Sequence, residues 1–198
     1  MIVVILSEWR FDDPKHSLND YCLHKELWTA FNKDEKQKRP FLFRSSRNEN
    51  KLSVIVLSYC EPEEIEGQKH IMRKLSFTPV LEKGRYYNFV LRANVIKRLN
   101  NERCRVPLIS QVSLIDWLKK KLGGAASISF VEVNEGERLH FKKDDKNKGE
   151  KCYVDIARTD YSGTIKCIDK NSLLSLVHNG IGPAKGFGCG LLLLRKLS

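Results

Sequence analysis

The first part of the chain alternates apolar and polar residues in a way that predicts a strand followed by a helix. Residues 2–6 form a short apolar run that is typical of a buried strand, and Asp12-Asp13-Pro14 breaks the pattern after it. Between residues 23 and 31, apolar side chains recur at intervals of three and four, which predicts an amphipathic helix. Ser17 or Asp20 can cap that helix.

Three further strands complete the pattern of a first domain. Residues 41–47 and 52–58 are rich in β-forming side chains and are separated by a short polar segment, so they predict a hairpin. An acidic stretch at residues 61–66 precedes a weak helical signal, and residues 86–92 predict a fourth strand. This order of strands and helices is that of a ferredoxin-like domain, which we assign to residues 1–94.

A polar and basic segment at residues 93–107 indicates the joint between two domains. Beyond it, residues 110–122 have the spacing of an amphipathic helix that Gly123 ends. Further strands are predicted at residues 128–133, 138–141, 152–157, 164–168 and 191–194, with a helix at residues 171–178. Residues 95–198 therefore echo the first half, and we predict an α+β fold of two tandem ferredoxin-like (RRM-like) βαββαβ domains.

The chain carries a large excess of positive charge. It has 35 lysine and arginine residues against 24 aspartate and glutamate residues, for a net charge of +11. Such a surface attracts nucleic acid or anionic lipid. The sequence has neither a run of about eighteen apolar residues nor a signal peptide, so we expect a protein that has no membrane span and is not exported.

The six cysteines occur singly, at residues 22, 60, 104, 152, 167 and 189. None belongs to a Cys-x-x-Cys pair, and no histidine lies at ligand spacing from any of them, so we expect no structural metal site. Reduced thiols are typical of the cytoplasm, which is the location that we expect.

A glycine-rich segment at residues 180–190 surrounds Lys185 and is the strongest local signal for a ligand. Its glycines, among twelve in the chain, are Gly180, Gly182, Gly186, Gly188 and Gly190. Glycines allow backbone N–H groups to turn outward and a large ligand to approach, and such groups beside a lysine suit phosphate. The segment thus favours a polyanionic ligand, although a tight turn into the final strand would have a similar composition.

Five segments, in order along nearly the whole chain, carry a family resemblance. They are Tyr21-Cys-Leu-His24-Lys-Glu-Leu-Trp28, Leu91-Arg-Ala-Asn94 with Lys97, Cys104-Arg-Val-Pro-Leu108, Trp117-Leu with Lys121-Leu-Gly123, and Gly180-Ile-Gly-Pro-Ala-Lys-Gly-Phe-Gly-Cys-Gly190. Together they closely resemble the CasE (Cse) family, the CRISPR repeat-processing endoribonucleases of the type I-E system. The resemblance implies a pair of ferredoxin-like domains, in agreement with the pattern above.

The resemblance also implies a reaction and its partners. It implies cleavage of the repeat hairpin in precursor CRISPR RNA without metal or another cofactor, and retention of the mature RNA with the other subunits of the Cascade complex. RNA carries its own nucleophile, so the site need only move protons, align the 2′-OH with the phosphorus and stabilise charge. The expected ends are a 2′,3′-cyclic phosphate and a 5′-OH.

The candidate catalytic residues lie three positions apart in the first predicted helix. His24 matches the catalytic histidine of the family, and an imidazole can act as a base or an acid near neutral pH. Tyr21 falls on the same helical face, where its hydroxyl could orient the phosphate, polarise the 2′-OH or donate to the leaving group. Without the resemblance, a packed histidine and a tyrosine at the edge of the core would fit the same pattern.

The candidate RNA contacts are basic residues outside that helix. Lys185 matches the lysine of the family's glycine-rich loop, and Lys142 and Lys143 begin a predicted hairpin tip at the position where the family inserts a basic hairpin into the RNA stem. Asp144 and Asp145 partly cancel the charge of this tip. The remaining candidates are Arg92, Lys97, Arg103 and Arg105, which could follow the phosphates or simply form a solvated joint between domains.

Two other functions remain open on the sequence alone. A module on the same fold could bind structured RNA without cutting it, but the intact pair of Tyr21 and His24 argues against this. A basic subunit that only docks proteins would fit the glycine-rich segment poorly. We expect Trp28 and Trp117 to pack in the core rather than to stack on bases.

Overall fold

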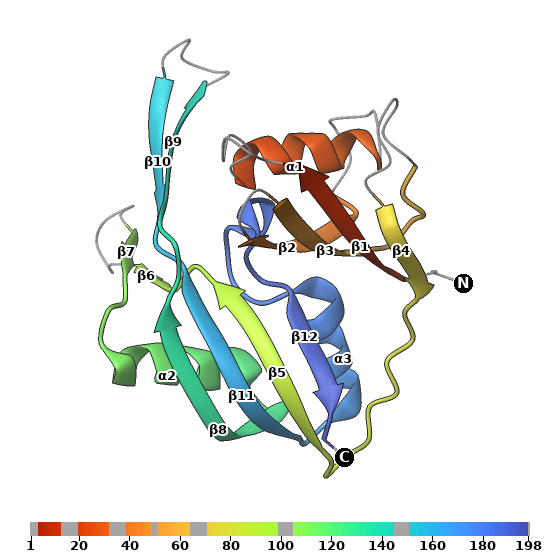
Figure 1. Ribbon diagram of the computed structural model, residues 1–198. Helices are drawn as coiled ribbons and strands as arrows, with labels where there is room; N and C mark the ends of the chain where they lie inside the picture. The colour runs from red at the N-terminus through yellow and green to blue at the C-terminus, as the bar shows by residue number, and fades with distance from the viewer. Residues whose placement is uncertain are drawn as a thin grey trace.

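The computed structural model describes residues 4–12, 20–31, 39–48, 51–63, 71–98, 105–144 and 151–197 of the 198-residue chain, and gives the backbone alone at residues 143, 144, 151 and 152. Two antiparallel sheets, each covered on one face by helix, account for most of these residues (Figure 1). Two hairpins of different length and a 3-10 turn complete the described part of the second half of the chain (Figure 1).

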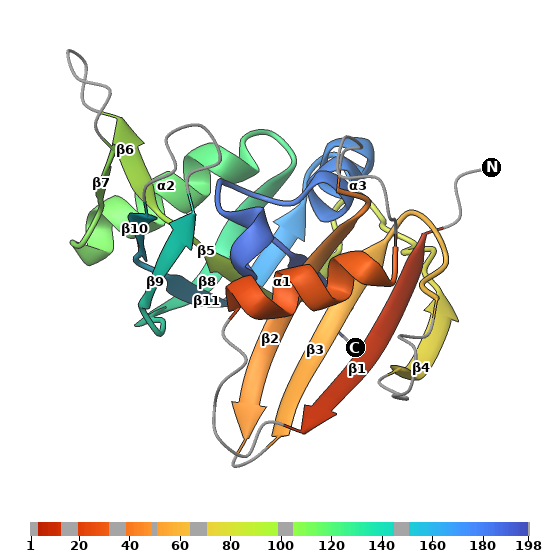
Figure 2. The ribbon, with the colours of Figure 1, turned by 90° about the horizontal axis from the view of Figure 1, so that it is seen from above.

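The first sheet has the strand order β2-β3-β1-β4, with every neighbouring pair antiparallel. Its strands are β1 (Ile5–Asp12), β2 (Phe41–Asn48), β3 (Lys51–Ser58) and β4 (Ile71–Ser76). Helix α1 (Asp20–Thr29) lies across β2, β3 and β1 (Figure 2). The predicted helix and hairpin of this half are confirmed, and β1 runs on to Asp12.

Alternation of side chains explains how this sheet and α1 pack. In β1 every second residue, including Trp9 and Phe11, is buried, and α1 contributes Leu23 and Leu27 from one face. These side chains meet Phe41, Phe43, Val54 and Val56 of the sheet in one core. Each fully buried apolar side chain of this kind stabilises the fold by about 1.5–3 kcal/mol, so α1 is held on the sheet by its buried face.

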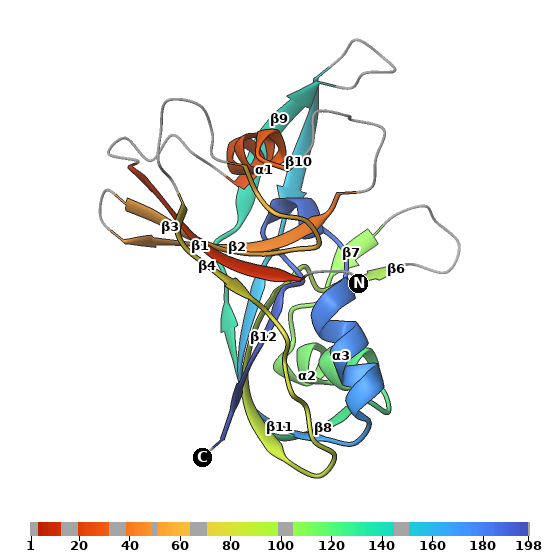
Figure 3. The same ribbon diagram turned by 90° about the vertical axis from the view of Figure 1, so that its right-hand side faces the viewer.

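The second sheet has the order β12-β5-β11-β8, which is the same ferredoxin-like order as the first. Its strands are β5 (Tyr86–Ala93), β8 (Ala126–Glu135), β11 (Thr159–Cys167) and β12 (Leu192–Lys196). Helices α2 (Gln111–Leu122) and α3 (Lys170–Asn179) cover one face (Figure 3). The predicted α+β fold of two tandem ferredoxin-like domains is therefore confirmed.

Both helices of the second domain begin and end where the sequence indicates. The Ser110 hydroxyl accepts a hydrogen bond from the Ser113 N–H at the start of α2, and the Gly123 N–H donates to the Lys119 carbonyl at its end. Trp117 is buried in the second core, and Trp28 packs against the first, as expected. No described helix is long and apolar enough to cross a bilayer.

One strand assignment was wrong. Residues 86–92 were expected to close the first sheet, but β5 pairs with β11 and β12 at the centre of the second. The first sheet is instead completed by β4, whose residues beyond Ile71 are all exposed and carry no apolar alternation. The sheets are thus joined through residues 77–85, not at the division after residue 94. The helix expected between the acidic stretch and residue 86 is not found in the described residues: residues 71–76 form β4 and residues 77–85 are not helical, while residues 64–70 lie outside the described residues.

Two hairpins are inserted into the second domain. Strands β6 (Ile96–Arg98) and β7 (Arg105–Pro107) form a short one beside α2, and the sequence analysis did not predict them. Strands β9 (Leu139–Asp144) and β10 (Lys151–Ile156) form a longer one that projects from the sheet past α1 (Figure 1). The 3-10 turn η1 (Lys185–Phe187) lies in the glycine-rich segment and packs against α1 and β2.

Candidate active site

The glycine-rich segment meets the imidazole of His24. A Cβ atom built on Gly186 would lie 3.8 Å from Cε1 and 3.9 Å from Nε2 of His24, so the ring borders the loop at this glycine. The ring also packs among aromatic side chains, with centroid distances of 5.8 Å to Trp28, 5.8 Å to Phe41 and 6.5 Å to Phe43. These contacts fix a partly exposed imidazole at the junction of α1, β2 and η1.

Tyr21 is held between the long hairpin and its own helix. Its ring stacks on Phe141 of β9 at 4.9 Å with an interplanar angle of 10°, and Phe187 of η1 lies 6.3 Å away. The Lys25 ammonium lies 4.4 Å from the centroid of the Tyr21 ring. Tyr21 and His24 therefore both face η1 from one side of α1, as the spacing predicted.

The glycine-rich segment is a closed loop anchored on the central strand of the second sheet. The Ile181 N–H donates to the Gly190 carbonyl at 2.8 Å, and the Gly190 N–H donates to the Arg92 carbonyl at 2.7 Å. Only glycine fits at Gly180, because its φ is 71° and an added Cβ would lie 2.9 Å from the Gly190 carbonyl oxygen, which closes the loop. The loop thus holds Lys185 and Gly186 at a fixed place opposite α1.

Two basic side chains meet over this loop. Lys185 Nζ donates to the Asn179 carbonyl at the end of α3, at 2.6 Å. Arg39 Nε donates to the Phe41 carbonyl at 2.7 Å, and its guanidinium lies 5.7 Å from the Phe41 ring centroid. Arg39 Nη1 would be 3.1 Å from a Cβ on Gly186, so the guanidinium and the His24 ring approach the same glycine.

The electrostatics of this region favour an anion. Burial lowers the pKa of the Arg39 guanidinium to about 10. The pKa of Lys185 is lowered mainly by burial and further by the positive charges of Arg39 and Lys121. Desolvation and like charges both disfavour a protonated amine, and a nearby phosphate would offset both.

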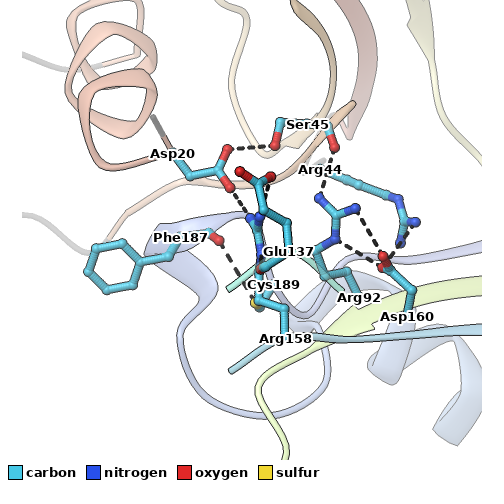
Figure 4. A network of polar contacts seen from close by, with 9 residues as sticks. All are labelled: Asp20, Arg44, Ser45, Arg92, Glu137, Arg158, Asp160, Phe187 and Cys189. Atoms are coloured by element: carbon cyan, nitrogen blue, oxygen red, sulfur yellow. Dashed lines mark hydrogen bonds and ion pairs between the residues drawn. The ribbon is translucent and has the colours of Figure 1, made fainter. Parts of the chain in front are cut away.

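A buried ion network joins the two domains beneath the site (Figure 4). Arg158, between β10 and β11, pairs with Asp20 at the start of α1 and with Glu137 at 2.9 Å. Asp20 also accepts a hydrogen bond of 2.5 Å from the Ser45 hydroxyl of β2. The carboxylate that was expected to cap α1 therefore binds this helix to the second domain and to the sheet below it.

Arg92 belongs to the same network, which argues against the prediction that it contacts RNA. Its guanidinium binds both carboxylate oxygens of Asp160, at 2.9 and 3.0 Å, and donates to the Ser45 carbonyl at 3.0 Å (Figure 4). Arg44 approaches the same carboxylate at 3.2 Å. Since the Arg92 side chain is only 14% exposed and its donors are engaged, it serves the domain interface instead.

The other basic candidates are spread over two hairpins. Lys97 and Arg105 are exposed on β6 and β7, away from α1 (Figures 1 and 2), while Arg103 lies outside the described residues. Lys142 is exposed on β9, with its Nζ 5.1 Å from the Tyr153 ring, and follows the Phe141 that contacts Tyr21. The structure describes only the backbone of Lys143. Of these residues, Lys142 alone adjoins a contact with α1.

Sequence reasoning missed several residues of the site. Arg39 is a single arginine before a proline and belongs to no motif. Phe141 and Phe187 have the composition of ordinary strand and loop residues, and only the fold brings both of them to Tyr21. Among the described residues, no group of three or more histidine, cysteine, aspartate and glutamate side chains could hold a metal ion. The cysteines with described side chains form no disulfide bond with one another; they are Cys22, Cys60, Cys167 and Cys189.

Comparison with known proteins agrees with this architecture. The family model described as "CRISPR associated protein" matches residues 1–196. The CRISPR system Cascade subunit CasE of Escherichia coli is 32% identical over 189 residues, covering 89% of this chain and 92% of that protein. CRISPR-associated endoribonuclease Cse3 of Thermus thermophilus is 28% identical over 189 residues, covering 88% of this chain and 89% of that protein.

Solved structures show the same fold. The crystal structure of Cas6e from Escherichia coli has a TM-score of 0.79 and 32% identity, covering 98% of this chain and 100% of the other. The structure of Cse3 bound to 19 nt RNA has a TM-score of 0.78 and 24% identity, covering 96% and 99%. With near-complete matches to the family model and to CasE, this chain belongs to the CasE family of CRISPR-associated proteins.

Proposed function

We propose that this chain is a metal-independent endoribonuclease that cleaves the repeat hairpin of precursor CRISPR RNA and retains the product as a Cascade subunit in the cytoplasm. The observation that carries the proposal is the meeting of the His24 imidazole with the lysine-bearing glycine loop at Gly186. Similar proteins support it, because one is named a CRISPR-associated endoribonuclease, another a Cascade subunit, and a structure of Cse3 contains bound RNA.

The proposed reaction uses the 2′-OH of the RNA as the nucleophile. His24 accepts the 2′-OH proton while the 2′ oxygen attacks the adjacent phosphorus, and the bond from phosphorus to the 5′ oxygen breaks. The products are a 2′,3′-cyclic phosphate and a 5′-OH, with one proton delivered to the leaving oxygen. Lys185, held 2.6 Å from the Asn179 carbonyl, supplies positive charge where the phosphate becomes more negative.

Tyr21 is the proposed second polar group of the reaction. Its ring is fixed between Phe141 and the Lys25 ammonium, so its hydroxyl has a defined direction at the end of α1 nearest the hairpin. The hydroxyl either orients the phosphate or protonates the leaving 5′ oxygen. A substrate with a 5′ bridging sulfur distinguishes the two roles, because a thiolate leaves without a proton: cleavage by Tyr21→Phe recovers on this substrate only if Tyr21 is the proton donor.

The long hairpin is the proposed contact with the RNA stem. A two-stranded ribbon is thin enough for the deep, narrow major groove of an A-form helix. The β9–β10 hairpin projects beside α1, and Lys142 is exposed on it one residue from the Phe141 that touches Tyr21 (Figure 1). A stem bound along this hairpin would place its base near His24. Lys97 and Arg105, on the other hairpin, are proposed to contact more distant phosphates.

The test is cleavage of the organism's own repeat hairpin RNA in EDTA, by wild type, His24→Ala and the matched control His140→Ala. His140 is exposed on β9, pairs with Asp155 at 3.3 Å and precedes the Phe141 that touches Tyr21, so it tests whether the loss of another histidine near α1 also stops cleavage. We expect cleavage by wild type and His140→Ala, none by His24→Ala, and none of an RNA with 2′-deoxyribose at the scissile nucleotide, with binding preserved throughout. Binding without cleavage by wild type would instead make the chain a structured-RNA-binding module.

A further inference from the structure

Three cations from three separate elements gather along the glycine loop. Arg39 precedes β2, Lys121 lies in the last turn of α2, and Lys185 is the first residue of η1. Arg39 Nη1 would be 3.1 Å from a Cβ on Gly186. At the other end of the loop, a Cβ on Gly182 would be 3.1 Å from the Trp117 ring, and Lys121 Nζ lies 5.7 Å from the centroid of that ring. The cations therefore form a row from α2 to His24.

No carboxylate balances these charges within the part of the chain that the structure describes. The polar partner of Arg39 is the Phe41 carbonyl, that of Lys185 is the Asn179 carbonyl, and Lys121 lies near an aromatic ring. Nearby basic residues behave differently. Lys119, two positions before Lys121, pairs with Asp116 at 3.7 Å, and Arg92 pairs with Asp160. The row is thus an uncompensated positive site, which suits a ligand with repeated negative charges.

The glycine at its centre lets two polar groups approach the same backbone position. Gly186 separates the Arg39 guanidinium from the His24 ring, and a Cβ there would crowd the first and touch the second. Because no side chain separates them, the guanidinium and the imidazole lie near enough to each other to contact one phosphate. A guanidinium presents several N–H donors to the two oxygens of a phosphodiester, and a donor of this kind gains strength as charge develops in the transition state.

We propose that Arg39 joins Lys185 at the scissile phosphate of the RNA strand that passes His24, and that Lys121 binds a flanking backbone phosphate. This assignment rests on the proposed function, and it gives the two new residues different roles. Arg39 touches the reacting phosphate and acts in catalysis, while Lys121 contributes to binding alone.

The roles predict separate effects in single-turnover cleavage. Arg39→Gln lowers the rate for bound RNA roughly 10²- to 10³-fold, as expected for the loss of one donor to the developing charge. Arg39→Lys restores only part of that rate, because an ammonium lacks the planar pair of donors. Lys121→Gln weakens binding without changing the rate once the RNA is bound. Lys119→Gln, the matched control on the same helix, changes neither.

Binding to an uncleavable 2′-deoxy substrate tests the phosphate contacts directly. Each of Arg39→Gln and Lys121→Gln should reduce the slope of log K against log salt by about 0.7 to 0.9, and Lys119→Gln should leave the slope unchanged. A neutral methylphosphonate is then placed at the scissile phosphate and at each neighbour in turn. On RNA with a neutral scissile phosphate, Arg39→Gln should bind with the same affinity as wild type. On RNA with one particular flanking phosphate neutral, Lys121→Gln should bind with the same affinity as wild type.

The outcomes separate this inference from the proposed function. If wild type cleaves the RNA but Arg39→Gln and Lys121→Gln match Lys119→Gln, the phosphate row is overturned and the endoribonuclease stands. If wild type binds without cleaving, the proposed reaction fails, while the salt slopes and methylphosphonates still decide where the phosphates sit. If wild type neither binds nor cleaves, both are overturned. Melting temperatures no lower than that of wild type exclude misfolding of the variants.

Discussion

Arg158 and Asp20 form a buried ion pair that joins the second domain to the first residue of α1. Their side chains are 1% and 6% exposed. A Cβ built on Gly188 would lie 3.3 Å from Asp20 Oδ2, so the pair also adjoins the glycine loop. The direction in which α1 presents Tyr21 and His24 is therefore set by a residue from the other domain.

We expect Asp20→Asn to destabilise the protein by about 3–5 kcal/mol, because it leaves the buried Arg158 guanidinium without its charge partner. Glu137→Gln is the matched control, since Glu137 pairs with the same guanidinium at 2.9 Å but is 71% exposed. Its loss should cost no more than about 1 kcal/mol. Urea unfolding of both variants measures the difference, and equal losses would show that burial does not set the strength of this pair.

Replacing Phe141 should slow cleavage more than it weakens RNA binding. Phe141→Leu removes the stacking surface that lies 4.9 Å from Tyr21, so the tyrosine loses its fixed direction. We expect a roughly tenfold or larger fall in the single-turnover rate, since small displacements of catalytic groups are costly. Tyr153→Leu, on the same hairpin but 77% exposed and with its ring beside the Lys142 ammonium, should leave the rate of bound RNA unchanged. Similar rates for the two variants would disprove the positioning role of Phe141.

A methyl group at Gly186 should impair the site while leaving the fold intact. In Gly186→Ala the new Cβ would lie 3.1 Å from Arg39 Nη1 and close to His24, so the guanidinium must move out of its place. The cleavage rate should fall roughly tenfold or more, with little change in melting temperature. At Gly124 an added Cβ would meet no atom within 4 Å, so Gly124→Ala should cleave like wild type. Full activity in Gly186→Ala would show that the close approach at this glycine is not needed.

RNA affinity should fall as the pH rises into the alkaline range, through Lys185. Its pKa in the free protein is below the usual 10.5 because of burial and neighbouring cations. A bound phosphate raises that pKa, so binding takes up a proton at pH values between the free and bound pKa, and affinity decreases across that window. Binding of the 2′-deoxy substrate, followed from neutral pH up to the usual lysine pKa of 10.5, measures this.

The matched variant for this pH dependence is Lys185→Arg. The pKa of an arginine is intrinsically higher than that of a lysine, so the loss of affinity with rising pH should be shallower in this variant. An equally steep loss in Lys185→Arg would assign the pH dependence to another group.

The sequence analysis was most reliable where a single segment determines its own structure. The caps of α2 at Ser110 and Gly123 and the pairing of β2 with β3 follow from local residues and are found in the structure. The placement of Tyr21 and His24 on one helix is equally local. The pairing partner of β5 is not determined locally, because an apolar strand fits either sheet. The exposed β4 has no apolar alternation, so the sequence did not indicate that β4 completes the first sheet.

The site residues divide in the same way. Arg92 and Arg39 are both single arginines in the sequence, and only folding separates them. Arg92 meets Asp160, which is far away along the chain, and becomes part of the domain interface. Arg39 donates to a backbone carbonyl and lies near Lys185, with no carboxylate partner among the described residues. A residue's role as a structural or a ligand-binding cation therefore depends on whether a distant carboxylate reaches it.

The placement of β12 and the glycine loop at the end of the element order has a consequence for protein synthesis. The first sheet and α1 are built from residues up to 76, so His24 leaves the ribosome long before Lys185. The central strand β5 can pair with β12 only after the glycine loop and β12 itself have been synthesised. A nascent chain thus holds His24 before the loop that carries Lys185 exists, and the proposed site is complete only when translation has reached the final strand.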